Sequence, residues 1–253
     1  MTTNIGIVSD EITRDFADAL RIGTGLGIRR YEIRNLPAGR APMCGDAAMR
    51  EVEMLARDAG VEITALSPGL FKMTAEEAEF RREMSEVYPR SVEWAKRWKL
   101  PGLITFGFHK NAPAQWVEWL AEAGERAAAD GLILMVEPEP ICWCDTGQAT
   151  VNAIAGKRGL KINYDPGNVA WLTGRDPLDE FDAVAPYIAN VHVKDLKGIV
   201  NGEPEWVPPG EGIIDYVAHF RKLRDYEGPI SLEPHGAEVG ACKRAIERIM
   251  DRR

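Results

Sequence analysis

Positive charge and long apolar runs are both scarce in this sequence. Its 31 lysines and arginines are outnumbered by 39 aspartates and glutamates, which gives a formal net charge of −8. Proteins that bind nucleic acid broadly carry a basic face, so this balance argues against a nucleic-acid partner. No stretch reaches the roughly 18 apolar residues of a membrane span, and the N-terminal residues lack the layout of a signal peptide. We therefore expect a cytoplasmic protein with no membrane partner.

Cysteine and histidine are also scarce, with four of each. Only Cys142 and Cys144 lie close together, and their Cys-Trp-Cys spacing matches neither a CxxC metal motif nor a disulfide framework. A zinc site built from thiolates or from several histidines is therefore excluded. Hydrophobic residues at 45% and charged residues at 28% are, in contrast, the ordinary proportions of a globular enzyme.

Short β-rich runs alternate with stretches of helical spacing along the whole chain, and glycine or proline marks many of the joints. Eight such pairs without a linker predict one (β/α)8 TIM barrel, a single domain over residues 1–253. A doubly wound sheet is the alternative, but no glycine-rich phosphate loop follows the first run, where the chain reads SDEITRD. The predicted strands are 4–10, 30–34, 61–68, 103–108, 132–138, 160–166, 188–195 and 229–235, and the clearest predicted helices are 15–26, 46–59, 75–98, 114–130 and 237–251.

Four late strands carry polar side chains where a buried parallel strand should be apolar. Asp165, His192 and Glu233 alternate with apolar neighbours in the last three predicted strands, and Glu137 ends the apolar run of the fifth. Side chains of a strand alternate with a period of two, so each polar group shares one side of its strand with the others of its set. We place these groups inside the mouth of the barrel.

This polar set is a candidate metal site. Burying its three carboxylates without a counter-charge would cost several kcal/mol per ion, and a divalent cation would remove that cost. Glu137, Asp165, His192 and Glu233 form a hard, oxygen-rich ligand set that suits Mn²⁺ best, with Mg²⁺, Co²⁺, Zn²⁺ or iron as alternatives. We therefore predict one divalent cation. Glu139 is a rival ligand because it has the same parity, but Glu137 lies nearer the apolar run.

Four segments resemble, in order, the sugar-phosphate isomerase/epimerase superfamily of xylose isomerase-like TIM barrels: VEPEP (136–140), NYDPGN (163–168), HVKD (192–195) and SLEPH (231–235). The resemblance covers essentially the whole chain. It implies the same four metal ligands, and it implies that Glu137 and Glu233 also serve as the acid/base pair. Many members have a substrate-contacting histidine where this chain has Asn168, which leaves the substrate class open.

Such a site suits proton abstraction next to a carbonyl that the metal polarises. We therefore expect an isomerase or epimerase of a small sugar or ketose, phosphorylated or not, that works through a metal-bound enediolate. Loss of a hydroxyl instead would make the protein a lyase or dehydratase of a keto-inositol or an oxidised glycoside. A sugar-binding barrel that depends on a partner protein is a third reading. The DNA-cutting branch of the superfamily is disfavoured by the few histidines and the acidic charge.

Residues near the predicted mouth are candidates to bind the sugar or polyol substrate. Asn168, Lys194, Arg34 and His109 would contact its oxygens, although a structural ion pair or hydrogen bond explains Arg34 and His109 equally well. Trp143 would pack on the apolar face of a sugar ring, although a role as a loop anchor or an oligomer contact explains it at least as well. Two further tryptophans, Trp171 and Trp206, would lie near the mouth. The loop 205–212 would act as a lid. The resemblance makes a homodimer or homotetramer the expected assembly.

Overall fold

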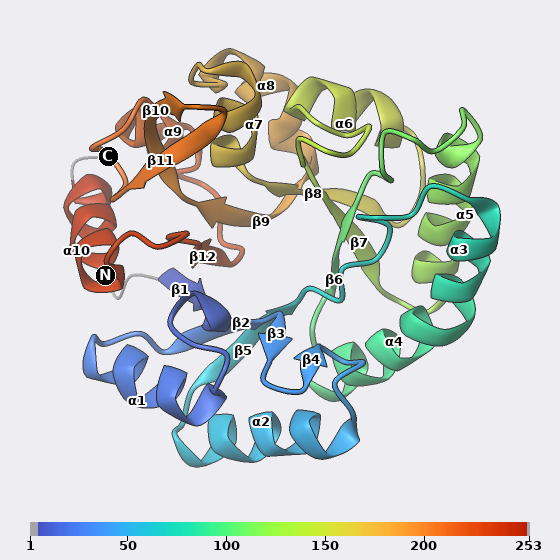
Figure 1. Cartoon of the computed structure of the whole chain (residues 1–253), viewed down its shortest axis with the longest axis horizontal. Helices are drawn as coiled ribbons and strands as arrows, with labels where there is room; N and C mark the ends of the chain where they lie inside the picture. Colours follow the sequence, from blue (N-terminus) through green and yellow to red (C-terminus); the bar gives the residue numbers. More distant parts are fainter. Residues whose placement is uncertain (1–4, 252–253) are drawn as a thin grey trace.

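The computed structural model describes residues 5–251, which form a single-domain (β/α)8 barrel (Figure 1). Eight parallel strands form one sheet in the order β5-β2-β1-β12-β9-β8-β7-β6. The backbone N of Phe106 at the end of β6 donates a hydrogen bond to Leu70 O, 3.1 Å away in the segment that follows β5, so the ring is nearly closed. The barrel strands are β1 (Ile5–Val8), β2 (Arg30–Ile33), β5 (Glu62–Leu66), β6 (Gly102–Phe106), β7 (Ile133–Glu137), β8 (Leu160–Tyr164), β9 (Ile188–Val193) and β12 (Ile230–Leu232).

Helices surround this ring of strands, as the alternation in the sequence predicts (Figure 1). Every predicted barrel strand is present, with ends that differ by at most three residues; Asn4, the predicted first residue of the first strand, lies outside the described residues. The helices are α1 (Phe16–Gly25), α2 (Asp46–Asp58), α3 (Glu77–Arg82), α4 (Tyr88–Arg97), α5 (Trp116–Ala129), α6 (Gly147–Ile154), α7 (Pro166–Thr173), α8 (Phe181–Val184), α9 (Tyr216–Lys222) and α10 (Val239–Met250).

One predicted helix is divided. The continuous helix expected over 75–98 consists of α3 and α4 joined by a wider π-helical segment, Glu83–Val87. Glu83 opens this segment, and its carboxylate accepts a hydrogen bond from the backbone N of Phe71, 2.8 Å away. The pattern of apolar residues predicts the helix but does not resolve this change of pitch.

Apolar side chains fill two regions. The larger core lies between the strands and the surrounding helices and includes Ile7, Ile162 and Val191, all buried. A smaller cluster of Ala65, Ile104 and Met135 is separate from it and occupies the interior of the barrel. The barrel is therefore packed rather than hollow, and its polar interior positions lie toward the carboxyl ends of the strands.

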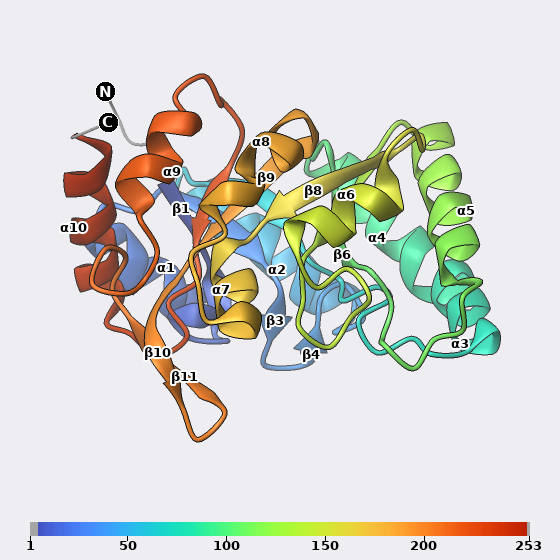
Figure 2. The same cartoon turned by 90° about the horizontal axis from the view of Figure 1, so that it is seen from above.

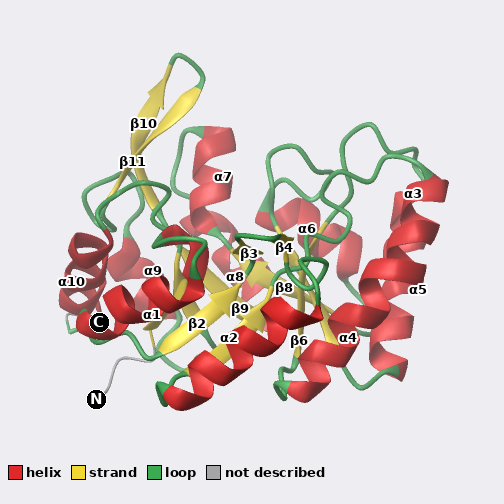
Figure 3. Cartoon of the chain, turned by 60° about the horizontal axis from the view of Figure 1, so that its bottom comes forward, coloured by secondary structure: helices red, strands yellow, loops and turns green. Residues whose placement is uncertain are grey.

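Two short antiparallel ribbons follow barrel strands and are absent from the sequence prediction. The first pairs β3 (Asn35–Leu36) with β4 (Gly39–Arg40), and the second pairs β10 (Asp195–Val200) with β11 (Glu203–Val207). The second ribbon projects away from the barrel (Figures 2 and 3). The last residues of β11 are also the first residues of the predicted lid loop, 205–212. The Asp195 carboxylate fixes this loop by accepting hydrogen bonds from Gly210 N (2.8 Å) and Gly212 N (3.1 Å). No helix within residues 5–251 is both long and apolar enough to cross a membrane.

Candidate metal centre

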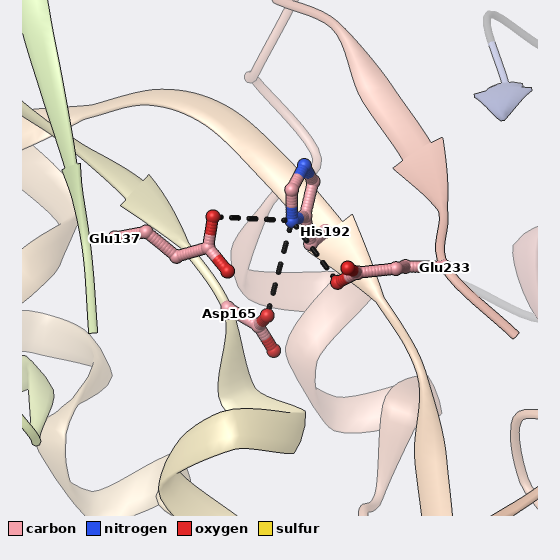
Figure 4. Close-up of side chains that lie close together, drawn as sticks. All are labelled: Glu137, Asp165, His192 and Glu233. Atoms are coloured by element: carbon pink, nitrogen blue, oxygen red, sulfur yellow. Dashed lines mark ion pairs between the residues drawn. The ribbon is translucent and has the colours of Figure 1, made fainter. Parts of the chain in front are cut away.

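Four side chains from adjacent barrel strands meet at the carboxyl ends of these strands (Figure 4). Glu137 ends β7, Asp165 follows β8, His192 lies in β9 and Glu233 follows β12. One ligand atom from each lies within 4.8 Å of the others, and all four residues are buried. The Nδ1 atom of His192 lies 3.6 Å from a Glu137 oxygen, 3.8 Å from an Asp165 oxygen and 3.3 Å from a Glu233 oxygen. The structure thus brings together the four residues that the sequence pattern indicates.

Glu32, a residue of β2, orients the imidazole from the other side of the barrel. Its Oε2 lies 2.9 Å from His192 Nε2, and both side chains are almost fully buried. In the neutral imidazole, a proton on Nε2 leaves the lone pair on Nδ1, which faces the three carboxylates and lies 3.2 Å from Asn163 Nδ2. Burial alone would lower the pKa of His192, but the charges of Glu32, Glu137 and Glu233 raise it well above its ordinary value.

Two asparagines orient Glu137. Asn163 Nδ2 donates to Oε2 at 2.9 Å, and Asn168 Nδ2 donates to Oε1 at 3.1 Å and to Pro138 O at 2.9 Å. Asn168, which the resemblance suggests as a substrate contact, therefore holds a carboxylate in this structure while lining the cavity described below. Burial alone would raise the pKa of Glu137, but the charge of His192 lowers it to about 2.

Asp165 has two distinct oxygens. Oδ1 caps α7 by accepting a hydrogen bond from Asn168 N at 3.0 Å, and Pro166 supplies the first residue of that helix. Oδ2 faces the cluster and lies 2.6 Å from Lys194 Nζ. Burial raises the pKa of Asp165 to about 6.

Two cations hold Glu233. Arg34 pairs with its Oε1, and Lys194 Nζ donates to its Oε2 at 2.6 Å. Arg34 also pairs with Asp10 at 3.1 Å and with Glu11 at 2.6 Å, so its guanidinium joins the end of β1 to the end of β12. Burial alone would raise the pKa of Glu233, but the surrounding cations hold it well below its ordinary value.

The donor set fits a divalent cation. Three buried carboxylates and one imidazole nitrogen converge on one position, each ligand is oriented by a hydrogen-bonded neighbour, and only one of the two Asp165 oxygens is used by the helix cap. Lys194, buried between Asp165 and Glu233, balances two of the carboxylates through its ammonium group. Glu139 lies outside the cluster because it pairs with Lys72 at 2.8 Å, so Glu137 is the glutamate that faces the site.

A cavity of about 280 Å³ opens beside the cluster, and Glu137, His192 and Glu233 belong to its lining. Trp171 and His235 belong to its wall on the metal side, and Trp206 stacks on His235 with a centroid distance of 4.9 Å. The opposite wall comes from the end of β6 and from the segments that follow β2 and β5. Its lining residues are Arg40, Ser67, Lys72 and Phe106.

Two residues predicted to bind substrate lie elsewhere. His109 forms an isolated bridge with Cys142, and its Nδ1 accepts a hydrogen bond from Asn111 N at 3.2 Å. Trp143 stacks on Trp116 and donates from Nε1 to a backbone carbonyl at 3.0 Å, so it fixes a loop. Neither belongs to the residues that line the cavity within the described chain. Lys194 and Arg34 do line it, although Arg34 is bound by three carboxylates.

Arg40 is one of the lining residues that the sequence does not predict, together with Ser67, Lys72 and Phe106. It lies in a two-residue strand, Gly39–Arg40, where no periodic pattern marks which way a side chain points. No sequence signal links Glu32 to a histidine 160 positions away.

Comparison with known proteins points to one family. A family model described as xylose isomerase-like TIM barrel matches residues 25–251. A 3-dehydroshikimate dehydratase from Bacillus anthracis is 24% identical over 224 residues, which span 81% of this chain and 79% of that protein. Two solved structures share the fold. One is a D-tagatose 3-epimerase-like protein with a TM-score of 0.77 and 17% identity, covering 98% of this chain and 97% of that one. The other, from Mycobacterium smegmatis in complex with magnesium, has a TM-score of 0.73 and 20% identity, covering 93% and 87%.

Proposed function

This chain belongs to the family of xylose isomerase-like TIM barrels, and from that premise we propose that it is a divalent-metal-dependent isomerase or epimerase of a small sugar or related ketose. Glu137, Asp165, His192 and Glu233 would hold the cation, for which we propose Mn²⁺. When bound, the cation supplies Lewis-acid polarisation of the substrate carbonyl and holds an adjacent hydroxyl. The volume of the cavity suits a small molecule rather than a polymer.

The observation that supports proton transfer is the placement of Glu137 and Glu233. They approach the shared position from opposite sides, from strands separated by β8 and β9 (Figure 4). One carboxylate removes the proton next to the carbonyl, and the other returns a proton from the opposite face, which inverts the carbon. If a single carboxylate works at both neighbouring carbons, the outcome is aldose–ketose isomerisation.

Lys194 has a second role in this proposal. Its ammonium, held between Asp165 and Glu233, has three donors and lies beside the position where negative charge develops on the substrate oxygen. A donor that is already buried and oriented stabilises that charge without reorganisation.

The test is exchange of a carbon-bound proton. Mn²⁺-loaded protein is incubated with ketoses in D₂O, and deuterium incorporation is followed by NMR beside the Glu233→Gln variant. We expect deuterium in the product and in recovered substrate, loss of exchange in Glu233→Gln, and a lower metal content in that variant. Glu125→Gln is the control because Glu125 is exposed, pairs with the exposed Arg158 and does not line the cavity, so it should retain both metal and exchange. Undiminished metal and exchange in Glu233→Gln would contradict the proposal.

A lyase is the second candidate, favoured by the match to a dehydratase over 81% of the chain. The same base would remove the proton, and a neighbouring hydroxyl would leave as water. The two candidates are separated by mass spectrometry of the product, because an epimerase retains every oxygen and a dehydratase loses one water. 3-Dehydroshikimate is the first compound to try in this arm.

A further inference from the structure

Arg40 is held rigidly at the wall of the cavity opposite the metal ligands. Its Nε donates to Ser67 O at 2.8 Å, and its Nη2 donates to Ser67 Oγ at 2.8 Å. Gly69 packs against the same group: a Cβ on that glycine would lie 3.2 Å from Nε and 3.3 Å from Cζ of Arg40. One edge of the guanidinium is therefore fixed by Ser67, and the edge formed by Nη1 and Nη2 keeps two parallel N–H groups without a partner among residues 5–251.

Arg40 also lacks a direct ion-pair partner among the described residues, although the charges of Asp10, Glu137 and Glu32 offset part of the effect of its burial. The three other lysines and arginines that line the cavity each lie within 2.8 Å of a carboxylate oxygen: Arg34 with Glu11, Lys72 with Glu139 and Lys194 with Asp165. Among the described residues Arg40 forms no ion pair. Burial, and after it the charge of Arg34, lower the pKa of Arg40 to about 10. A half-buried cation without an ion-pair partner is less favourable than a paired one, and an anionic ligand would offset that cost.

We propose that Arg40 binds a carboxylate of the substrate, which makes the substrate a small hydroxy- or oxo-carboxylic acid rather than a neutral sugar. The free edge of the guanidinium presents the parallel donors that match a carboxylate in bidentate geometry. The one positive charge of Arg40 balances the single negative charge of a carboxylate but only half the charge of a phosphate dianion. The opposite end of the molecule would then face Glu137, His192 and Glu233. This inference rests on the proposed function because it assigns a substrate to the same cavity.

The test compares ligands that differ in one group. D-Fructose, D-fructuronate and D-fructose 6-phosphate share their first five carbons, and 3-dehydroshikimate with its methyl ester provides a second pair. Each compound is titrated calorimetrically into Mn²⁺-loaded wild type, Arg40→Gln and Arg40→Lys. Arg224→Gln is the control, since Arg224 is exposed and pairs only with the exposed Asp225 among the described residues. Circular dichroism and metal content show whether each variant folds and keeps its site.

We expect at least one carboxylate to bind on the order of tenfold to a hundredfold more tightly than its neutral counterpart, since hydrogen bonds to charged groups contribute that much. Arg40→Gln should reduce this preference to within about twofold, Arg40→Lys should retain part of it, and Arg224→Gln should leave it unchanged. Ser67→Ala, a milder variant that frees the fixed edge of the guanidinium, should weaken carboxylate binding without loss of fold.

Three results would overturn the inference: no carboxylate binding above that of the neutral compounds, a preference that survives Arg40→Gln, or an Arg40-dependent preference for the phosphate. The proposed function fails separately. Arg40-dependent carboxylate binding without any carbon-bound proton exchange or loss of water would support the anion site and contradict the enzyme activity. Carbon-bound proton exchange that does not depend on Arg40 would support the enzyme activity and contradict the anion site.

Discussion

The ammonium nitrogen of Lys194 lies 2.6 Å from Oδ2 of Asp165, beside the position on which the four candidate metal ligands converge. The same nitrogen lies 2.6 Å from Glu233. One buried cation thus compensates two of the three carboxylates that would bind a metal. Charge on Lys194 and charge on a divalent cation stabilise the same pair of side chains, so their effects on the stability of the protein are linked.

Lys194→Met should destabilise the metal-free protein by about 3–5 kcal/mol, because it leaves Asp165 and Glu233 buried without their shared partner. Mn²⁺ should then raise the free energy of unfolding more in the variant than in the wild type. Urea unfolding of both proteins, with and without Mn²⁺, measures this difference. Lys222→Met is the control: Lys222 pairs with the exposed Asp182, so about 1 kcal/mol or less is expected. An equal Mn²⁺ effect in the variant and the wild type would contradict the linkage.

Gly167→Ala should disturb the same lysine from the opposite side. A Cβ at Gly167 would lie 2.3 Å from Cγ and 2.9 Å from O of Lys194, so β9 or α7 must shift. We expect a loss of about 1–3 kcal/mol, as for overpacked interiors, together with weaker Mn²⁺ binding. Gly25→Ala is the matched control, because nothing within 4 Å meets a Cβ there. Thermal unfolding and metal titration of both variants check the prediction, and indistinguishable variants would refute it.

The sequence predicts the barrel and the metal ligands because both depend on local periodicity. Asp165, His192 and Glu233 stand at polar positions among apolar neighbours, and the carboxyl ends of parallel strands meet by construction of the fold. The opposite wall of the cavity has no such signal. Arg40 reaches this wall from a short ribbon, and its side chain is oriented by hydrogen bonds to Ser67, 27 positions away. Such contacts are not visible as a pattern in the chain.

The same limit explains the two residues that lie outside the cavity. His109 follows a barrel strand at the predicted mouth, but a bridge to Cys142 turns that loop away. Trp143 has an indole ring of the kind that packs on sugars, but in this structure the ring stacks on Trp116. Position after a strand indicates the correct end of the barrel, whereas the direction of a loop side chain depends on its tertiary contacts.

Arg34 and Arg40 should respond differently to the same substitution. Arg34→Met breaks ion pairs with three buried or nearly buried carboxylates, so we expect a loss of about 3–5 kcal/mol in the free energy of unfolding. Arg40→Met removes a cation without a carboxylate partner among the described residues, so a change of about 1 kcal/mol or less is expected in the absence of ligand. Chemical denaturation of the two variants measures the contrast. Equal losses would show that Arg40 has a structural ion-pairing role.

Metal binding should release protons in a number that depends on pH. Burial raises the pKa of Asp165 to about 6, and the surrounding carboxylates raise the pKa of His192 well above its ordinary value despite burial. A ligand must lose its proton before it binds a cation. At a pH of about 7.5 Asp165 is already ionised, so Mn²⁺ should displace about one proton, from His192. At a pH of about 5 Asp165 is protonated as well, and about two protons should leave.

The apparent affinity for Mn²⁺ should therefore fall by about tenfold per unit as the pH drops through the neutral range and by about a hundredfold per unit below pH 6. Burial would raise the pKa of Glu137, but the charge of His192 lowers it to about 2. Glu137 therefore stays ionised throughout and adds no further dependence of Mn²⁺ affinity on pH. Calorimetric titrations in buffers of different ionisation enthalpy count the protons directly. Asp165→Asn should abolish the additional proton at low pH while leaving the one from His192. A count that is the same at both pH values in the wild type would show that Asp165 is ionised across the whole range and is fully compensated by Lys194 alone.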